Sequence, residues 1–183
     1  MKKIILLVLI TFNSFCFAQK LTVTPTGLKD ANDNEKTFVV IPVEGKTAKQ
    51  LYDDAIKYIT KTYKNPDNVI KGRTEGEYLK FDTYAPGFIF IRNGMKVYFD
   101  AKYITELSFK DGKVKYEIVD LEMHNPNNNN PLVFSGGTFE WSIYNKKGEV
   151  KKEDAKTDFD NYFNSQIQSL STFLQGKTTD DKW

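Results

Sequence analysis

Residues 96–121, KVYFDAKYITELSFKDGKVKYEIVDL, contain two runs of alternating apolar and polar side chains joined by the dipeptide Asp111-Gly112. Apolar residues repeat at every second position in each run, which is typical of half-buried β-strands. An Asp-Gly loop of two residues favours a tight hairpin, because both positions must adopt positive φ. The register that follows pairs Lys110 with Lys113, Phe109 with Val114, Leu107 with Tyr116 and Thr105 with Ile118. Turn chemistry and apolar pattern therefore predict the same long antiparallel hairpin.

The preceding residues predict a continuous antiparallel meander that leads into this hairpin. Its predicted strands are Val69 to Thr74, Glu77 to Tyr84 and Phe88 to Arg92, separated by Glu75-Gly76, a four-residue turn from Tyr84 to Gly87, and Asn93-Gly94. These turns are rich in Gly and Pro, the residues that tight turns require. The predicted register places Ile70 opposite Phe81, Gly72 opposite Leu79, Phe90 opposite Val97 and Phe88 opposite Phe99. We therefore expect a five-stranded sheet with one apolar face.

Two amphipathic helices are expected to cover that face. Thr47 and Gln50 form a capping box at the start of a helix over about 48–63. Thr157 with Asp160 predicts the cap of a long C-terminal helix over about 158–174. Further strands are predicted at 37–43, where Pro42 indicates an edge, and around Trp141. The predicted fold class is α+β: an antiparallel β-meander sheet of five to seven strands with an N-terminal helix and a long C-terminal helix packed on it.

The N-terminal residues have the features of a secretory signal peptide. Lys2 and Lys3 precede an apolar run, and Cys16-Phe17-Ala18 has the small-x-small pattern of a cleavage site, which predicts cleavage between Ala18 and Gln19. The alternative is a lipoprotein signal acylated on Cys16, although bulky Phe15 disfavours it. We then expect an extended lead-in at 19–36, a single α+β domain at 37–175 and a flexible tail at 176–183. The expected location is the periplasm, the periphery of the outer membrane or the extracellular space.

Composition restricts the classes of function. Loss of Lys2 and Lys3 would reduce the basic residues from 26 to 24, equal to the 24 acidic residues. Nucleic-acid binding depends on an excess of Lys and Arg, so we expect no nucleic-acid partner. Cleavage would also remove the single cysteine, and with it thiolate chemistry. The apolar run is too short for a permanent membrane span, so none is expected after cleavage.

Residues that can carry chemistry are few and scattered. His124 is the only histidine, and it follows the hairpin without a cysteine or second histidine to work with. A carboxylate hydrolase would need two acids within about 5 to 10 Å of each other in a cleft. The candidates for that hypothesis are Asp82, Asp100, Asp120 and Glu122. The sequence therefore predicts a non-catalytic protein with no metal and no cofactor.

The face of the predicted sheet that points away from the helices is the expected binding surface. It is mostly charged, but it also carries the apolar residues Ile89, Ile91, Tyr98, Ile104 and Val119. Strict alternation would place Asp120 on the apolar face, so a β-bulge is expected to turn it outward and Leu121 inward. Either another segment covers the apolar residues or they bind a partner, an envelope protein or a glycan. An alternative function is a carrier that holds an apolar small molecule between sheet and C-terminal helix, among Phe88, Phe90, Phe99, Phe159, Tyr162 and Phe163.

These patterns together resemble a known family. The helix containing Leu51-Tyr52, the meander with its glycine-marked turns, the run from Asp111 to Leu121 and the closing helix are similar to the exported Bacteroidota family called domain of unknown function 4468. The resemblance implies a TATA-binding-protein-like fold, in which a curved antiparallel sheet carries helices on one face, and an envelope location without DNA binding. The motifs contain no catalytic signature, and a shared fold does not transfer a function.

Overall fold

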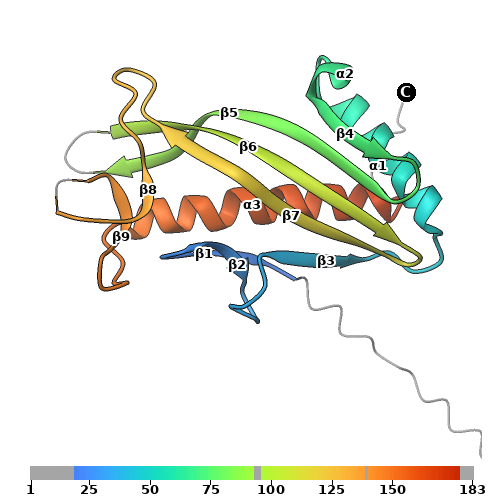
Figure 1. Ribbon diagram of the computed structural model, residues 1–183, viewed down its shortest axis with the longest axis horizontal. Coiled ribbons are helices and arrows are strands. Elements are labelled where there is room, and N and C mark those ends of the chain that lie inside the picture. Colours follow the sequence, from blue (N-terminus) through green and yellow to red (C-terminus); the bar gives the residue numbers. More distant parts are fainter. Residues whose placement is uncertain (1–18, 93–95, 139, 178–183) are drawn as a thin grey trace, which may run out of the picture.

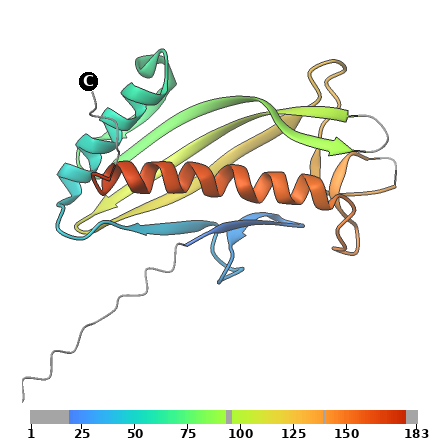
Figure 2. The same cartoon turned by 180° about the vertical axis from the view of Figure 1, so that it is seen from behind.

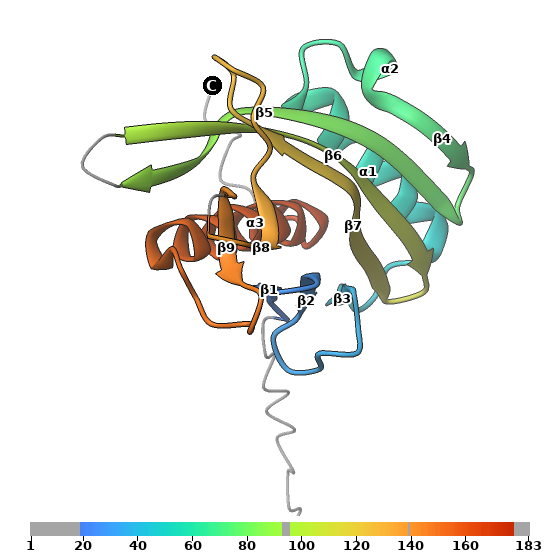
Figure 3. The same cartoon turned by 60° about the vertical axis from the view of Figure 1, so that its left-hand side comes forward.

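The computed structural model describes residues 19–92, 96–138 and 140–177, and it confirms the α+β fold class. Its central element is a curved antiparallel sheet of five strands in the order β3-β7-β6-β5-β4. Helices α1 (Ala48–Thr62) and α3 (Glu153–Leu174) lie against the concave side of this sheet (Figures 1 and 3). The convex side, pointing away from both helices, is called the outer face below.

The predicted central hairpin is confirmed. Strand β6 (Lys96–Lys110) pairs with β7 (Lys113–His124), and all four predicted pairs, from Lys110 with Lys113 to Thr105 with Ile118, are present. Gly112 has φ +75°, as the two-residue turn requires. Phe109, Val114 and Tyr116 are buried on the concave side. Burial of one complete apolar face therefore fixes this register.

Strand β5 (Tyr78–Arg92) corrects the predicted meander. The expected turn from Tyr84 to Gly87 does not form, because the chain continues as one strand that pairs with β6 on both sides of a β-bulge between Ala85 and Ile89. Residues 86–88 lie opposite Asp100 alone. The main-chain N–H of Gly87 donates a hydrogen bond to Asp100 Oδ1 (2.8 Å), and Gly87 has φ +62°. The Pro-Gly pair thus marks a bulge within a strand.

The register beyond the bulge also differs from the prediction. Ile89 pairs with Phe99, Phe90 with Tyr98 and Ile91 with Val97, whereas the expected partners were Phe88 with Phe99 and Phe90 with Val97. Arg92 pairs with Lys96 instead of the predicted Met95, and the predicted Asn93-Gly94 turn itself lies outside the described residues. A shift of one residue exchanges the two faces of a strand. Ile89 is therefore fully buried instead of lying on the outer face.

Strands β3 and β4 form the two edges of the sheet. Strand β3 (Phe38–Pro42) pairs with β7 and ends at Pro42, as expected for an edge strand. Strand β4 (Ile70–Thr74) follows the short helix α2 (Pro66–Val69) and pairs with β5. The predicted pair Ile70 with Phe81 is present, but a register shift places Gly72 opposite Lys80 instead of Leu79.

Helix α1 begins as the sequence predicts. Thr47 Oγ1 accepts the N–H of Gln50, and Gln50 Oε1 accepts the N–H of Thr47, which completes the capping box. The buried residues of this helix are Leu51, Tyr52, Ala55, Tyr58 and Ile59. Their spacing produces one apolar stripe, which packs on the sheet.

Helix α3 begins earlier than predicted. It starts at Glu153, with Lys152 as the N-cap residue and no side-chain cap, so the predicted cap by Thr157 and Asp160 is wrong. Acidic Glu153 and Asp154 occupy the first turn, where the positive end of the helix dipole favours them. Buried Ala155 places this turn against the core. Tertiary packing therefore extends the helix by five residues, more than one turn, beyond its strongest local signal.

The segment predicted as an extended lead-in is a folded hairpin. Strands β1 (Leu21–Thr24) and β2 (Gly27–Asp30) pair with each other, and β1 lies along α3 (Figure 2). A further pair, β8 (Val133–Gly136) and β9 (Ser142–Asn145), is parallel and lies at the N-terminal end of α3 (Figure 1). Strand β9 contains Ile143 of the predicted sixth strand, whereas Phe139 lies outside the described residues. None of the helices in the described part is long and apolar enough to span a membrane.

Candidate functional site

The predicted apolar patch on the outer face does not form as a single surface. Ile89 has an exposed fraction of 0% because it lies on the concave side. Ile91 pairs with Val97, and its side chain lies outside the described residues. Tyr98 is 46% exposed, but it lies six residues along β6 from Ile104, a separation of about 20 Å in an extended strand. Ile104 remains on the outer face, half-buried.

The predicted β-bulge at Asp120 is present. Ile104 pairs with Val119, and the register between β6 and β7 shifts beside this pair, so that Lys102 faces Glu122. Asp120 is exposed and has φ +51°, a left-handed conformation that Asp tolerates better than most residues. The bulge thus turns a carboxylate outward at the middle of the sheet and keeps it out of the core.

A hollow of about 330 Å³ lies on the outer face around this bulge. It is lined by Lys71, Asp82, Lys102, Tyr103, Ile104, Asp120 and Glu122. An ion pair joins Lys71 Nζ to Asp82 Oδ2 at 3.2 Å, with both side chains partly exposed. Such a pair adds little stability in water, so both groups can exchange it for a ligand. The hollow combines hydrogen-bond donors and acceptors around one half-buried isoleucine.

Asp100 accepts two hydrogen bonds on the outer face next to this hollow. One carboxylate oxygen accepts the N–H of Gly87, and the other accepts the hydroxyl of Tyr84. Tyr84 is 64% exposed, and its partner across the strands is Lys102, which lines the hollow. The hydrogen bond to Asp100 raises the pKa of the Tyr84 hydroxyl above its ordinary value. The Tyr84 ring is therefore exposed, uncharged at neutral pH and held at its hydroxyl.

Tyr84 is not among the predicted site residues, although its sequence context carries a signal. The Ala85-Pro86-Gly87 run lies inside an otherwise alternating strand, and such a run with an acidic residue on the facing strand is compatible with a bulge. Tyr98 lies on the same outer face, where a Cβ atom placed on Gly87 would lie 4.0 Å from its Cδ1 atom. Two exposed tyrosines therefore lie on either side of Asp100.

The residues considered for catalysis do converge in part. His124 is the cross-strand partner of Asp100, and Glu122 is the partner of Lys102. Asp82 and Asp120 lie at the hollow with Glu122. Within residues 19–92, 96–138 and 140–177, no group of three or more His, Cys, Asp or Glu side chains is placed to hold a metal ion. This arrangement presents a polar surface with acids on three strands.

The aromatic residues considered for a carrier cavity contact one another. The ring of Phe88 lies edge-on to Phe159, Tyr162 and Phe163, with centroid distances of 5.2, 4.6 and 5.5 Å. The hydroxyls of Tyr103 and Tyr162 are 2.9 Å apart and share a hydrogen bond. Phe99 is fully buried, and the side chain of Phe90 lies outside the described residues. The described rings therefore fill the space between sheet and α3 with edge-to-face contacts.

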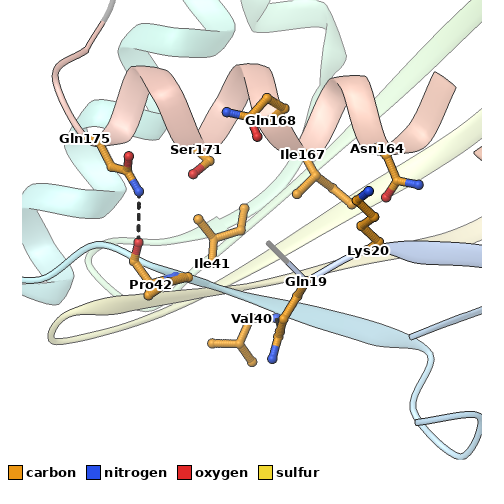
Figure 4. Close-up of a pocket in the computed structure, with 10 residues that line it drawn as sticks. All are labelled: Gln19, Lys20, Val40, Ile41, Pro42, Asn164, Ile167, Gln168, Ser171 and Gln175. Atoms are coloured by element: carbon orange, nitrogen blue, oxygen red, sulfur yellow. Dashed lines mark hydrogen bonds between the residues drawn. The ribbon is translucent and has the colours of Figure 1, made fainter. Parts of the chain in front are cut away.

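A second pocket, not predicted from the sequence, lies between the C-terminal half of α3 and the edge strand β3 (Figure 4). Its volume is about 240 Å³, and its lining is Gln19, Lys20, Val40, Ile41, Pro42, Asn164, Ile167, Gln168, Ser171 and Gln175. The helical residues recur every three or four positions, which places them on one face of α3. That periodicity is visible in the sequence. The groove, however, forms because β3 lies opposite this face of the helix, and the sequence does not show that.

Comparisons with known proteins support the fold. A DUF4468 family protein from Bacteroides ovatus has a similar solved structure, with 13% identity, a TM-score of 0.54, and coverage of 80% of this chain and 88% of that chain. A TBP-like protein from Parabacteroides distasonis is also similar, with 11% identity, a TM-score of 0.53, and coverage of 75% of this chain and 90% of that chain. No family model and no curated protein matches the sequence. The predicted TATA-binding-protein-like fold is thus confirmed, and at these identities the likeness concerns the fold alone.

Proposed function

We propose that this protein is an exported, non-catalytic binding module of the cell envelope that holds a glycan on the outer face of its sheet. The observation that carries the proposal is the exposed Tyr84 ring, fixed through its hydroxyl by Asp100 next to the polar hollow. A rigid ring offers contact area at a small entropic cost. The preformed site then needs little reorganisation when it binds.

The chemistry of the hollow favours a hydroxyl-rich partner. Sugar hydroxyls both donate and accept hydrogen bonds, and the site offers ammonium donors from Lys71 and Lys102 with carboxylate acceptors from Asp82, Asp120 and Glu122. The centre of a protein interface is usually depleted in charge and rich in apolar contacts. Here the aliphatic part of the lining is half-buried Ile104. A glycan therefore fits this composition better than a protein surface does.

Export is part of the proposal and rests on the sequence of residues 1–18. The N-terminal residue of protein isolated from a cell-envelope fraction tests it. A mature chain that begins at Gln19 is expected. A chain acylated on Cys16 would identify a lipoprotein instead, and a chain that keeps residues 1–18 in the cytoplasm would contradict export.

Binding is tested with polysaccharide extracted from a bacterial envelope and immobilised on a surface. We expect saturable binding that Tyr84→Ala weakens about tenfold or more, since the platform is lost. Tyr78→Ala is the matched control, because Tyr78 lies on the same strand but six residues, about 20 Å, from Tyr84. Equal binding by both variants would contradict the site. A different result would contradict the choice of a glycan as the partner: the protein captures another protein but no glycan, and Tyr84→Ala abolishes that capture.

A further inference from the structure

The helix face that borders the second pocket already binds an extended main chain. Asn164 Oδ1 accepts the N–H of Leu21 (3.0 Å), and Asn164 Nδ2 donates to the carbonyl of the same residue (2.9 Å). One turn earlier, Asp160 Oδ1 accepts the N–H of Val23 (2.7 Å). These three contacts are with the main chain of β1, and one further bond, from the Thr22 hydroxyl to Asp160 Oδ2 (3.1 Å), is with a side chain. Helix α3 therefore holds β1 largely through its main chain, as a neighbouring strand would.

The same face continues beyond β1 with side chains of the same chemistry. Gln168, Ser171 and Gln175 follow Asn164 at steps of four, three and four residues, and all of them line the groove against β3 (Figure 4). Amide and hydroxyl groups both donate and accept hydrogen bonds, as a peptide main chain does. Ile41 and Ile167 add an apolar surface to the lining. The groove therefore extends the line of β1 towards the end of α3.

Strand β3 supplies the opposite wall through its free edge. The N–H of Val40 donates to the side-chain Oε1 of Gln19, and Gln175 Nε2 donates to the carbonyl of Pro42 at 3.3 Å. Both edge groups are thus covered by single side-chain amides. A single side-chain amide protects a sheet edge only weakly. The main chain of a peptide can replace it and form the same hydrogen bond.

We propose that this groove binds an extended peptide segment of a partner protein and recognises it through its main chain. Beyond Asn164 and its bonds to Leu21, the groove extends about 10 Å along α3 from Gln168 to Gln175, which an extended segment covers with about three residues. The segment would continue the direction of β1 and therefore run antiparallel to β3. Its N-terminal end would lie near Gln175, where the negative end of the α3 dipole favours a positive charge.

This site is distinct from the glycan site of the outer face. Its lining residues come from the N-terminal segment, β3 and α3, whereas the hollow is lined from β4 to β7. Recognition through the main chain predicts affinity for extended peptides with little dependence on side chains. A synthetic five-residue peptide of alternating threonine and valine is therefore a suitable probe, and the same peptide with methylated alternate main-chain nitrogens is its control.

Binding can be followed by the NMR shifts of the purified protein during titration with each peptide. The unmodified peptide is expected to shift the Val40 amide and the side-chain amides of Gln168 and Gln175. Methylation should weaken binding about tenfold or more, because it removes main-chain donors and leaves the side chains unchanged. Equal binding of both peptides, or no shift at about 1 mM peptide, would overturn the proposal.

A pair of variants locates the site. Ser171→Trp fills the groove and should abolish the shifts, while Ser165→Trp should preserve them within about twofold, because exposed Ser165 lies on another face of α3. Circular dichroism establishes that both variants are folded. If Ser171→Trp unfolds, Gln168→Trp serves in its place, because exposed Gln168 also lines the groove. Binding by a folded groove-filled variant as tight as by the parent protein would contradict the site. Self-association through β1 of a second copy, seen as a dimer that the peptide does not dissociate, would also contradict it.

Discussion

Asn164 forms two hydrogen bonds with the main chain of Leu21, accepting from its N–H at 3.0 Å and donating to its carbonyl at 2.9 Å. These residues lie 143 positions apart in the sequence. The contact joins the N-terminal hairpin to the last helix. It also explains why residues 19–36, which are polar and rich in turn formers, are part of the folded domain instead of a loose lead-in.

Replacing Asn164 with Ala should therefore destabilise the protein by about 2 to 4 kcal/mol, because two main-chain groups of Leu21 lose their partner. Urea unfolding measures the change. Asn161→Ala is the matched control, since Asn161 is exposed on the same helix and should change stability by less than about 0.5 kcal/mol. Equal unfolding midpoints for the two variants would show that the hairpin is held mainly by its apolar contacts.

The elements with a strong local signal were predictable from the sequence. The Asp111-Gly112 turn and the alternation around it determined the register of β6 and β7, and the Thr47 and Gln50 box determined the start of α1. The start of α3 was missed because Glu153 has no side-chain cap before it and depends on tertiary packing. The lead-in hairpin was missed for the same reason, since its partner is a distant helix.

The predicted register of β5 after Gly87 was wrong because the side chain of Asp100 stabilises a bulge at this position. This side chain stabilises a bulge by bonding Gly87 and Tyr84, and the sequence does not reveal that bond. The predicted outer residue Ile89 was consequently assigned to the wrong face, and the exposed tyrosine site was overlooked. Asp120, by contrast, was predicted because a carboxylate in a core strand is so costly that a bulge is the expected solution.

The corrected register predicts a large difference between two isoleucines. Ile89→Ala should cost about 2 to 4 kcal/mol of unfolding free energy, because Ile89 is fully buried beside Phe99. Ile104→Ala, on the outer face, should cost about 1 kcal/mol or less. Chemical denaturation measures the loss of unfolding free energy in each of the two variants. A larger loss for Ile104 than for Ile89 would restore the register that the sequence suggested.

The left-handed backbone conformation of Asp120 predicts that glycine at this position does not lower stability. Asp120→Gly should leave stability unchanged or raise it by up to about 1 kcal/mol, because glycine adopts φ +51° without strain. Asp120→Val should lower stability by about 1 to 3 kcal/mol, since a β-branched residue strongly disfavours the left-handed region. Thermal unfolding compares the two variants. A stable valine variant would mean that the bulge can move along β7, which the backbone hydrogen exchange of Leu121 and Glu122 would reveal.

The buried tyrosines predict a loss of stability in alkaline solution. Burial raises the pKa of Tyr63 to about 12, and it also raises the pKa of Tyr103 and Tyr116. A folded-state pKa above the unfolded value of 10.0 means that the stabilisation is fully present below pH 10 and is lost as pH rises towards the folded-state pKa. We therefore expect unfolding free energy to fall from pH 10 upward, with tyrosinate absorbance and loss of secondary structure appearing together.

Tyr63→Phe tests this dependence at one of these tyrosines. The variant loses the hydrogen bond between the Tyr63 and Thr83 hydroxyls (2.6 Å), so its stability at neutral pH should fall by about 1 kcal/mol. Its stability should also decline less steeply between pH 10 and 12, because one ionising group has been removed. Tyr84→Phe is the comparison variant: the pKa of its mostly exposed hydroxyl is raised chiefly by the hydrogen bond to Asp100, so its removal should flatten the slope less than removal of buried Tyr63 does. If Tyr63→Phe showed the same alkaline slope as the parent protein, ionisation of Tyr63 would not contribute to unfolding, and the slope would have to come from Tyr103 and Tyr116, whose rings lie deeper in the core.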